Sequence, residues 1–136
     1  TSDATFEALA AFRFTLRQFL AFSDGAAKTS GVTAQQYQAM LVIRVGGHDG
    51  PSVKQLAQEL VLQPHGAVQL VDRLAAMGVV ERRASQEDRR RVHVVLTAAG
   101  NRLVSKLAAQ HVSELVRHRP LLVESLRRLK SVRPRR

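Results

Sequence analysis

Apolar side chains recur three and four positions apart in several stretches of the chain, which is the spacing of one helical face. Over residues 5–22 this pattern predicts an amphipathic helix, and residues 23–25 (Ser-Asp-Gly) predict its end or a kink. Phe14 and Phe22 fall outside the main apolar stripe of this helix. A second face is therefore expected to be buried, as happens at a subunit interface.

A second helix is predicted to begin at Thr33, where Gln36 three positions later completes a capping box. Residues 46–51 (Gly-Gly-His-Asp-Gly-Pro) cannot continue a helix, so they predict a connecting loop. The expected apolar face of this helix consists of Tyr37, Met40, Leu41 and Val45.

Two short helices separated by a tight turn are predicted next. Ser52 is expected to cap the first, over residues 53–60, and Pro64 occupies the first position of the second. Gly78 is a natural residue to follow the end of the second helix. That helix is expected to bury Ala67, Val68, Leu70, Val71 and Leu74. Its outer side then carries Gln63, His65, Gln69, Asp72 and Arg73.

The last part of the chain predicts a hairpin followed by helix. Residues 79–83 and 92–96 have the composition of strands, and the polar, Arg-rich residues 84–91 form the loop between them. Thr97 is expected to cap a long helix with two neighbouring apolar rows. Pro120 is expected to start a separate last helix.

Composition limits the class of protein. Hydrophobic residues make up 45% of the 136-residue chain, which is enough for the core of one globular domain. There is no Cys, so disulfides and thiolate metal sites are excluded. No apolar run is long enough to span a membrane and no secretory signal is apparent, so we expect a cytoplasmic protein without a membrane partner.

The net charge is +10, from 21 Lys and Arg against 11 Asp and Glu, and this excess favours a polyanionic partner such as double-stranded DNA. The excess is greatest in residues 101–136, outside the predicted hairpin. A solvated helix face and a sequence-independent DNA contact are both open interpretations of that segment.

The predicted first and last helices carry more apolar surface than their own chain is expected to cover. Small domains with such helices commonly bury them against a second copy. We therefore predict a two-fold homodimer with interleaved terminal helices. The alternative is a monomer in which these helices pack on the rest of the chain.

Two segments resemble the MarR family of transcription regulators. Residues 60–82 are similar to its recognition helix and first wing strand. The order of the predicted helices is also that of the family, so the resemblance extends over nearly the whole chain. Residues 88–100 resemble the family's wing signature, with matches at Asp88, Arg90, Val94, Leu96, Thr97 and Gly100.

The resemblance implies a mainly α fold with a small β-hairpin wing, namely a winged helix-turn-helix flanked by N- and C-terminal dimerisation helices. Residues 1–136 would form one domain, with dimerisation helices in residues 1–30 and 101–136 and the DNA-binding region in residues 31–100. The resemblance also implies a homodimeric, sequence-specific repressor of a pseudo-palindromic operator, associated with the nucleoid when bound. A small aromatic or anionic effector would release it from DNA.

The wing signature implies roles for two side chains. In the family, the Arg that matches Arg90 enters the minor groove, and the Asp that matches Asp88 orients its guanidinium. Arg89 and Arg91 are expected to contact phosphates. The alternative is a solvated basic turn without a role in binding.

The predicted recognition helix departs from the family pattern, which often has small hydroxyl residues near the helix start and an Arg one turn later. Base-reading roles are therefore not carried over. By its own chemistry Gln69 can pair with adenine, and His65 can donate to a base or a phosphate. Arg73 can contact a phosphate or pair with Asp72. The other candidate DNA-binding residues are Ser52, Lys54, Gln63 and Pro64.

An effector site is implied by the family alone. Aromatic side chains together with an Arg or His suit a phenolic or carboxylate ligand. Ordinary core and interface packing is the alternative for each candidate. The candidates, on the helices that would enclose the site, are Phe12, Phe19, Tyr37, Arg44 and His48.

Other kinds of chemistry find less support. His111 and His118 are seven positions apart, whereas helical zinc pairs more often use a spacing of four, so no metal site is assigned. A metal-responsive regulator is kept only as an alternative. The sequence has no Gly-rich phosphate loop, nucleophile elbow or paired carboxylates, so neither an enzyme nor a cofactor is predicted. A sequence-independent architectural DNA-binding protein is the other alternative function.

Overall fold

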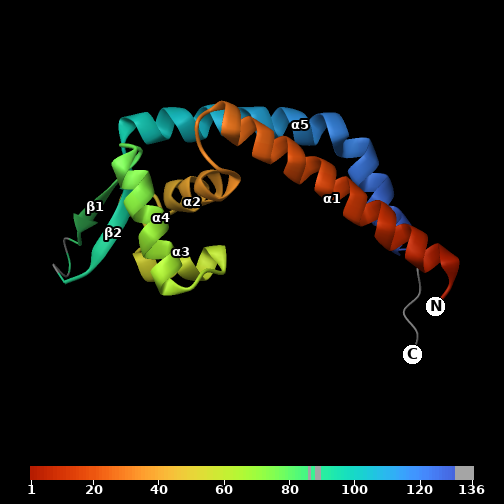
Figure 1. Cartoon of the computed structure of the whole chain (residues 1–136), viewed down its shortest axis with the longest axis horizontal. Helices are drawn as coiled ribbons and strands as arrows, with labels where there is room; N and C mark the ends of the chain where they lie inside the picture. Colours follow the sequence, from red (N-terminus) through yellow and green to blue (C-terminus); the bar gives the residue numbers. More distant parts are fainter. Residues whose placement is uncertain (86, 88–89, 131–136) are drawn as a thin grey trace. The chain divides into compact units, whose positions relative to one another are not determined.

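The structure is a computed structural model that describes residues 1–85, 87 and 90–130. The chain divides into two compact units. We call residues 27–108 the winged region, and residues 1–26 with the described part of residues 109–136 the terminal-helix region. The elements, in chain order, are α1 (Asp3–Thr29), α2 (Ala34–Val45), α3 (Val53–Leu60), α4 (Pro64–Ala76), β1 (Val80–Ala84), β2 (Val92–Leu96) and α5 (Ala98–Lys130) (Figure 1).

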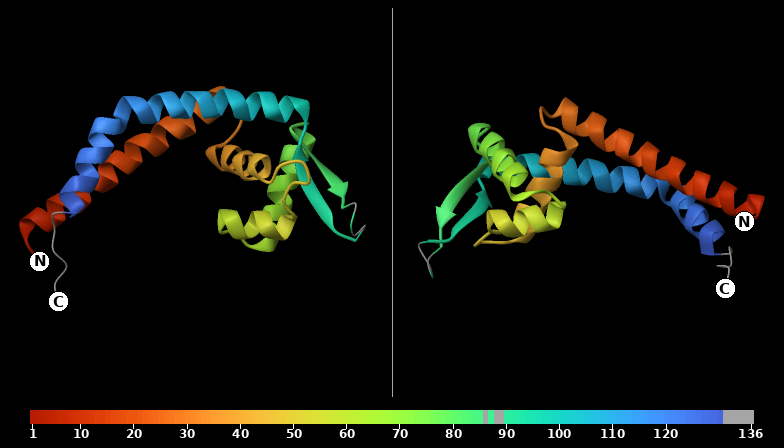
Figure 2. Two further views of the ribbon diagram at one scale, coloured as in Figure 1. Left: turned by 180° about the vertical axis from the view of Figure 1, so that it is seen from behind. Right: turned by 60° about the horizontal axis from the view of Figure 1, so that its bottom comes forward.

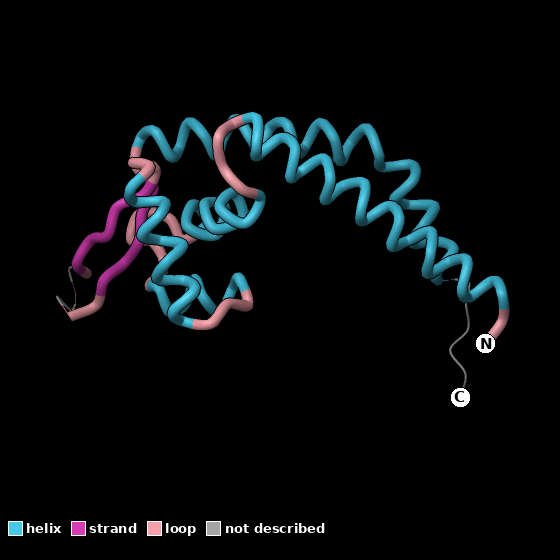
Figure 3. Tube along the Cα trace, in the orientation of Figure 1, coloured by secondary structure: helices cyan, strands magenta, loops and turns pink. Residues whose placement is uncertain are grey.

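The winged region has a core of aliphatic side chains. Each of its helices buries one face, and the hairpin of β1 and β2 follows α4 and packs against it (Figure 3). The predicted architecture, mainly helical with one β-hairpin, is therefore confirmed for the described residues. The largest fully buried side chains are Met40, Ile43, Leu56, Val71, Leu74, Val94 and Leu107.

The helix starts in this region are satisfied by side chains. Thr33 accepts a hydrogen bond from the backbone N–H of Gln36 at 3.0 Å, and the Gln36 side chain accepts one from the Thr33 N–H at 2.9 Å. Ser52 and Gln55 form the same reciprocal pair at the start of α3. Pro64 stands in the first turn of α4, where its missing N–H costs no helical hydrogen bond. The predicted caps are thus confirmed.

The loop before α3 is joined to the hairpin. The strands pair antiparallel, with Val80 opposite Leu96. On the other side of β2, the N–H of Val94 donates to the carbonyl of Pro51 at 2.8 Å. The backbones of Gly50 and Val94 lie so close together that a Cβ on Gly50 would be 1.9 Å from the Val94 carbonyl oxygen. Only glycine fits at this position. The wing therefore holds the start of the helix-turn-helix directly.

Two residues of the wing signature join the hairpin to α5. The hydroxyl of Thr97 accepts from the N–H of Gly100 at 3.1 Å and donates to the Gly78 carbonyl at 2.6 Å. A Cβ on Gly100 would lie 2.0 Å from the carbonyl oxygen of Val79. The Thr and the Gly of the signature are therefore explained by packing at the base of the wing.

Two predicted helix boundaries were wrong. α1 continues through residues 23–25, because the Ser23 hydroxyl has a partner on α5 and an interior glycine costs only about 1 kcal/mol. α5 continues through Pro120, so no separate last helix exists. The missing N–H of a proline removes one helical bond, and a helix with good neighbouring turns responds by bending. Figure 2 shows α5 changing direction in its C-terminal part.

Two predicted core side chains are exposed. α2 buries Tyr37, Met40 and Ile43, and Val45 lies two positions further, about 200° around the helix. Val45 is consequently 86% exposed. Val68 is 41% exposed, because it projects between the buried face of α4 and its outer side. Both valines were predicted to be buried because they are hydrophobic, and that prediction was wrong because of where they lie around their helices.

The terminal-helix region buries little of its apolar surface. His111 of α5 is buried, with its Nε2 2.8 Å from the Ser23 hydroxyl, and the rings of Phe19 and Phe22 meet it edge-on. Large apolar side chains lie exposed along both helices. They are Phe6, Leu9, Phe14, Leu16 and Leu20 on α1, and Val112, Leu115, Val116, Leu121, Val123 and Leu126 on α5.

Candidate nucleic-acid interface

The outer side of α4 is open to solvent. The residues of α4 that are buried in the core of the winged region recur every three or four positions. The residues between them face outward. The ring Nε2 of His65 lies 3.3 Å from the amide nitrogen of Gln69, which places these two candidates together one turn apart. The candidates Gln63, Pro64, His65, Gln69 and Arg73 are all exposed.

Asp72 joins α4 to the wing. Its carboxylate accepts a hydrogen bond from Arg82 of β1 at 2.5 Å, so Asp72 pairs with Arg82 where the sequence had suggested Arg73. Arg83 pairs in turn with Glu81 at 2.5 Å. These two ion pairs neutralise the cations at the base of the hairpin. Sequence reasoning missed Arg82, because its partner is ten residues away on another element.

The wing candidates are described only in part. Arg90 and Arg91 are exposed on the loop between the strands. Asp88 and Arg89 lie outside the described residues, so the predicted pairing of Asp88 with Arg90 stays a prediction. Neither of the two ion pairs at the hairpin base involves Arg91 or Lys54, which lies on α3.

A groove lies between α3 and β2. Its volume is about 500 Å³, and it brings Ser52, Lys54 and Arg91 together. None of the described residues that line it is acidic. Gln55 and Gln58 also line it and were missed, although their spacing of three on α3 placed them on one face. The hydroxyl and the N–H of Ser52 are both used in the capping box. The positive charge of the groove comes from Lys54 and Arg91.

A model of the MarR family matches residues 30–91. The chain has the winged-helix fold, and its likeness to the MarR family extends over these residues. The match covers α2, α3, α4, β1 and the wing loop, and it ends just before β2.

Solved structures of MarR-family regulators share this fold. AbsC of Streptomyces coelicolor is 21% identical, with a TM-score of 0.76 over 87% of this chain and 80% of that one. CouR of Rhodococcus jostii, bound to p-coumaroyl-CoA, is 23% identical, with a TM-score of 0.75 over 86% and 82%. A MepR mutant of Staphylococcus aureus, bound to an oligodeoxyribonucleotide, is 18% identical, with a TM-score of 0.70 over 90% and 95%.

The solved structures that share this fold include those of MarR-family transcription regulators. At such identities the likeness establishes the fold alone. What DNA sequence and what ligand this chain binds is inferred from its own residues. A comparison with curated proteins found no significant match.

The five effector candidates fall in both units. Phe12 and Phe19 are half-buried on α1 in the terminal-helix region. Tyr37 is 5% exposed in the winged region, and burial raises the pKa of its phenol. Arg44 and His48 are exposed and share a cavity of about 280 Å³ with Arg83 and Asn101. The structure therefore brings Arg44 and His48 to one site.

His111 and His118, the two histidines considered as a metal pair, have protein partners. His111 contacts Ser23, and the Nε2 of His118 lies 2.6 Å from a carboxylate oxygen of Glu114. Among the described residues, no three His, Asp or Glu side chains are grouped so as to hold a metal ion. Likewise, no described helix is both long enough and apolar enough to cross a membrane.

Proposed function

We propose that this protein is a sequence-specific DNA-binding transcription regulator that acts as a homodimer on a pseudo-palindromic operator in the cytoplasm. One observation carries the proposal: the uncovered outer side of α4 stands in the same region as a groove lined by Lys54 and Arg91. An exposed polar helix followed by a basic hairpin is the arrangement that winged helix-turn-helix proteins use on duplex DNA.

The proposed contacts divide by chemistry. On α4, Gln69 and His65 present amide and imidazole groups that match the edges of bases in the major groove. Lys54 and Arg91 line the groove beside α3, where they contact phosphates and fix the register without reading sequence. Arg90 extends from the wing to the minor groove. Gln55 and Gln58 join the candidates as neutral donors to the backbone.

Self-association follows from the terminal-helix region. Its exposed Phe, Leu and Val side chains lie on both α1 and α5. An apolar surface of this extent on a small protein favours burial against a second copy. Two copies related by a two-fold axis would present two α4 helices to two half-sites, which is why the operator is expected to be pseudo-palindromic.

The regulatory mode is proposed as repression relieved by a small aromatic or anionic effector. The cavity shared by Arg44 and His48 supplies groups that suit a carboxylate. The structure of CouR contains p-coumaroyl-CoA, an aromatic thioester with an anionic carrier, so a protein of this fold accommodates such a ligand.

An architectural, sequence-independent DNA-binding protein is the second candidate. The last turn of α5 carries Arg127, Arg128 and Lys130, and Arg127 forms an ion pair with Glu124. Such a basic helix end binds phosphates without regard to sequence. A regulator keeps a large ratio of specific to random affinity as salt is raised, and an architectural protein does not.

The proposal is tested by Arg90→Ala in a gel-shift titration with operator DNA. We expect the variant to lose about 1–3 kcal/mol of binding free energy, because a cation at the minor groove is removed from an exposed loop. Arg102→Ala is the matched control, since Arg102 is also exposed but lies in the first turns of α5. Equal affinity of the folded Arg90→Ala variant and the wild type would refute the role of the wing.

A further inference from the structure

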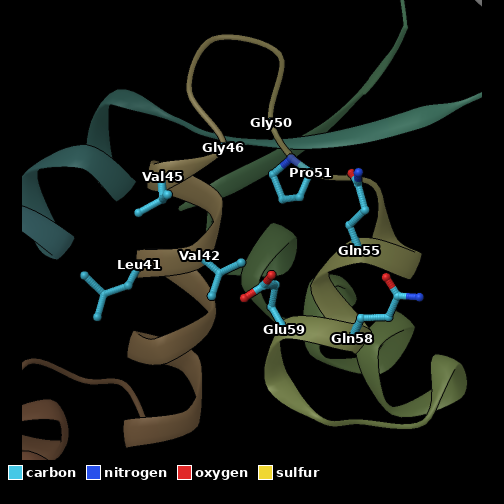
Figure 4. Close-up of a pocket in the computed structure, with 9 residues that line it drawn as sticks. All are labelled: Leu41, Val42, Val45, Gly46, Gly50, Pro51, Gln55, Gln58 and Glu59. Carbon is cyan, nitrogen blue, oxygen red and sulfur yellow. The ribbon is translucent and has the colours of Figure 1, made fainter.

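A second groove in the winged region shares Gln55 and Gln58 with the groove beside β2, but its other lining residues have no role in the proposed DNA contacts. It lies between the C-terminal half of α2 and α3, and its volume is about 620 Å³ (Figure 4). This volume is in the range of sites that hold drug-sized ligands. The groove is lined by Leu41, Val42, Val45, Gly46, Gly50, Pro51, Gln55, Gln58 and Glu59.

One wall of the groove is apolar and the other is polar. Leu41, Val42 and Val45 project from α2, and Pro51 closes one end. Val45 is 86% exposed, so its side chain is accessible to a ligand at the rim of the groove. An apolar wall that the protein itself leaves open is suited to the body of an organic ligand.

The charge of the groove differs from that of the rest of the chain. Lys and Arg outnumber Asp and Glu by 21 to 11 in the sequence, yet none of the nine lining residues is basic. Glu59 supplies the only charge, and its carboxylate points into the space between the helices (Figure 4). Among the described residues no ion pair or hydrogen bond of the Glu59 side chain is found.

The helix end adds to this negative character. Val42, Val45 and Gly46 at the end of α2 line the groove, and the carbonyl end of a helix carries partial negative charge. Arg44 of the same turn lines the other cavity. A carboxylate and a helix C-terminus on the same apolar cavity both favour a cation. Neither would favour an anion, so the groove differs in chemistry from the cavity of Arg44 and His48.

We propose that the groove between α2 and α3 binds a small apolar organic cation, such as a protonated amine or an onium ion with an aromatic or aliphatic body. The body packs on Val42, Val45 and Pro51, and the positive centre lies beside the Glu59 carboxylate. Gln58, one position before Glu59 on the rim, offers a side-chain carbonyl as a further acceptor. This ligand is distinct from the aromatic or anionic effector proposed above, and its binding does not depend on DNA.

The test measures binding of tetraphenylphosphonium to the full chain by equilibrium dialysis without DNA. We expect saturable binding of one cation per chain. The neutral probe triphenylphosphine oxide, which has the same aromatic rings, is expected to bind more weakly. Glu59→Gln should weaken binding of the cation about three- to tenfold, because an ion pair near the surface contributes modestly. Glu7→Gln, an exposed carboxylate on α1, is the matched control and should leave binding unchanged.

A second variant locates the site. Val45→Arg places a fixed cation on the apolar wall at an exposed position, so the fold is retained and tetraphenylphosphonium binding is lost. Absence of saturable binding, or equal binding by Glu59→Gln and the wild type, would overturn the proposal. A changed oligomeric state in Val45→Arg would also overturn it, since a second copy would then cover the groove. Affinity for operator DNA is measured in a separate experiment. A negative result with tetraphenylphosphonium therefore does not bear on the proposed DNA binding.

Discussion

The winged region and the terminal-helix region bury their apolar side chains in different ways. In the winged region, Met40, Leu56 and Leu74 are fully buried by neighbours from the same chain. In the terminal-helix region, the apolar residues Phe6, Leu121 and Leu126 are each more than half exposed, and the best-buried groups include the polar Ser23 and His111. The winged region therefore has a buried hydrophobic core, whereas the terminal-helix region leaves an apolar face exposed.

The difference indicates which contacts each region needs. The winged region has its caps, core and hairpin within residues 27–108, so its stability is expected to depend on internal packing. The terminal-helix region gains most by covering its exposed side chains with another chain. Folding of the first should therefore be independent of protein concentration, whereas the second should become more stable as concentration rises.

The largest effect is expected from Leu74→Ala in the winged region. Loss of a fully buried leucine leaves a cavity, so the free energy of unfolding should fall by about 2–5 kcal/mol in urea denaturation followed by circular dichroism. Val45→Ala is the control within the same region, and its exposed side chain should change stability by less than about 0.5 kcal/mol. Similar losses in both variants would remove the distinction between core and surface on which the comparison depends.

The next effect is expected from the double variant Val112→Glu and Val116→Glu. Both valines are more than half exposed and lie one turn apart on α5. Two charges on a face that a partner covers should weaken self-association by about 2–4 kcal/mol, measured by sedimentation equilibrium. Val45→Glu makes the same change on an exposed valine of the winged region and should leave the oligomeric state as it is. If the double variant associates as tightly as the wild type, these positions are not part of an interface.

The smallest effect is expected at the turn between α3 and α4. Val61 has φ 54° and ψ 46°, a left-handed conformation that is unfavourable for a β-branched residue. Val61→Gly relieves that strain, and the greater freedom of glycine in the unfolded chain offsets part of the gain. The unfolding free energy should rise by about 0.5–1 kcal/mol in the same urea assay. A loss of stability would show that the valine side chain makes contacts worth more than the strain.

Local signals predicted most of the winged region. Thr33, Ser52 and Pro64 mark helix starts because their side chains act on backbone groups within a few residues. The signature residues Thr97 and Gly100 were predicted from the family resemblance, and the structure supplies the reason, a cap and a close approach at the base of the wing. Where the cause of a structure is local, the sequence was sufficient.

The errors have non-local causes. In isolation Ser23 looks like a helix end and Pro120 like a helix start, but each lies inside a long helix. For Ser23 the reason is a contact with His111 of α5, which is distant in sequence. The pairing of Asp72 with Arg82 depends on how α4 meets β1, and spacing along the chain does not reveal it. The groove containing Glu59 likewise arises only when α2 and α3 are brought together.

The proposed DNA binding is tested most directly by selecting bound duplexes from a random DNA pool with the full chain. A two-fold dimer of this protein should enrich an inverted repeat whose half-sites are centred about 34–36 Å apart, because its two α4 helices enter successive major grooves; this is the expected result. Recovery of a pool with no enriched sequence, at a salt concentration where the protein still binds DNA, would contradict it.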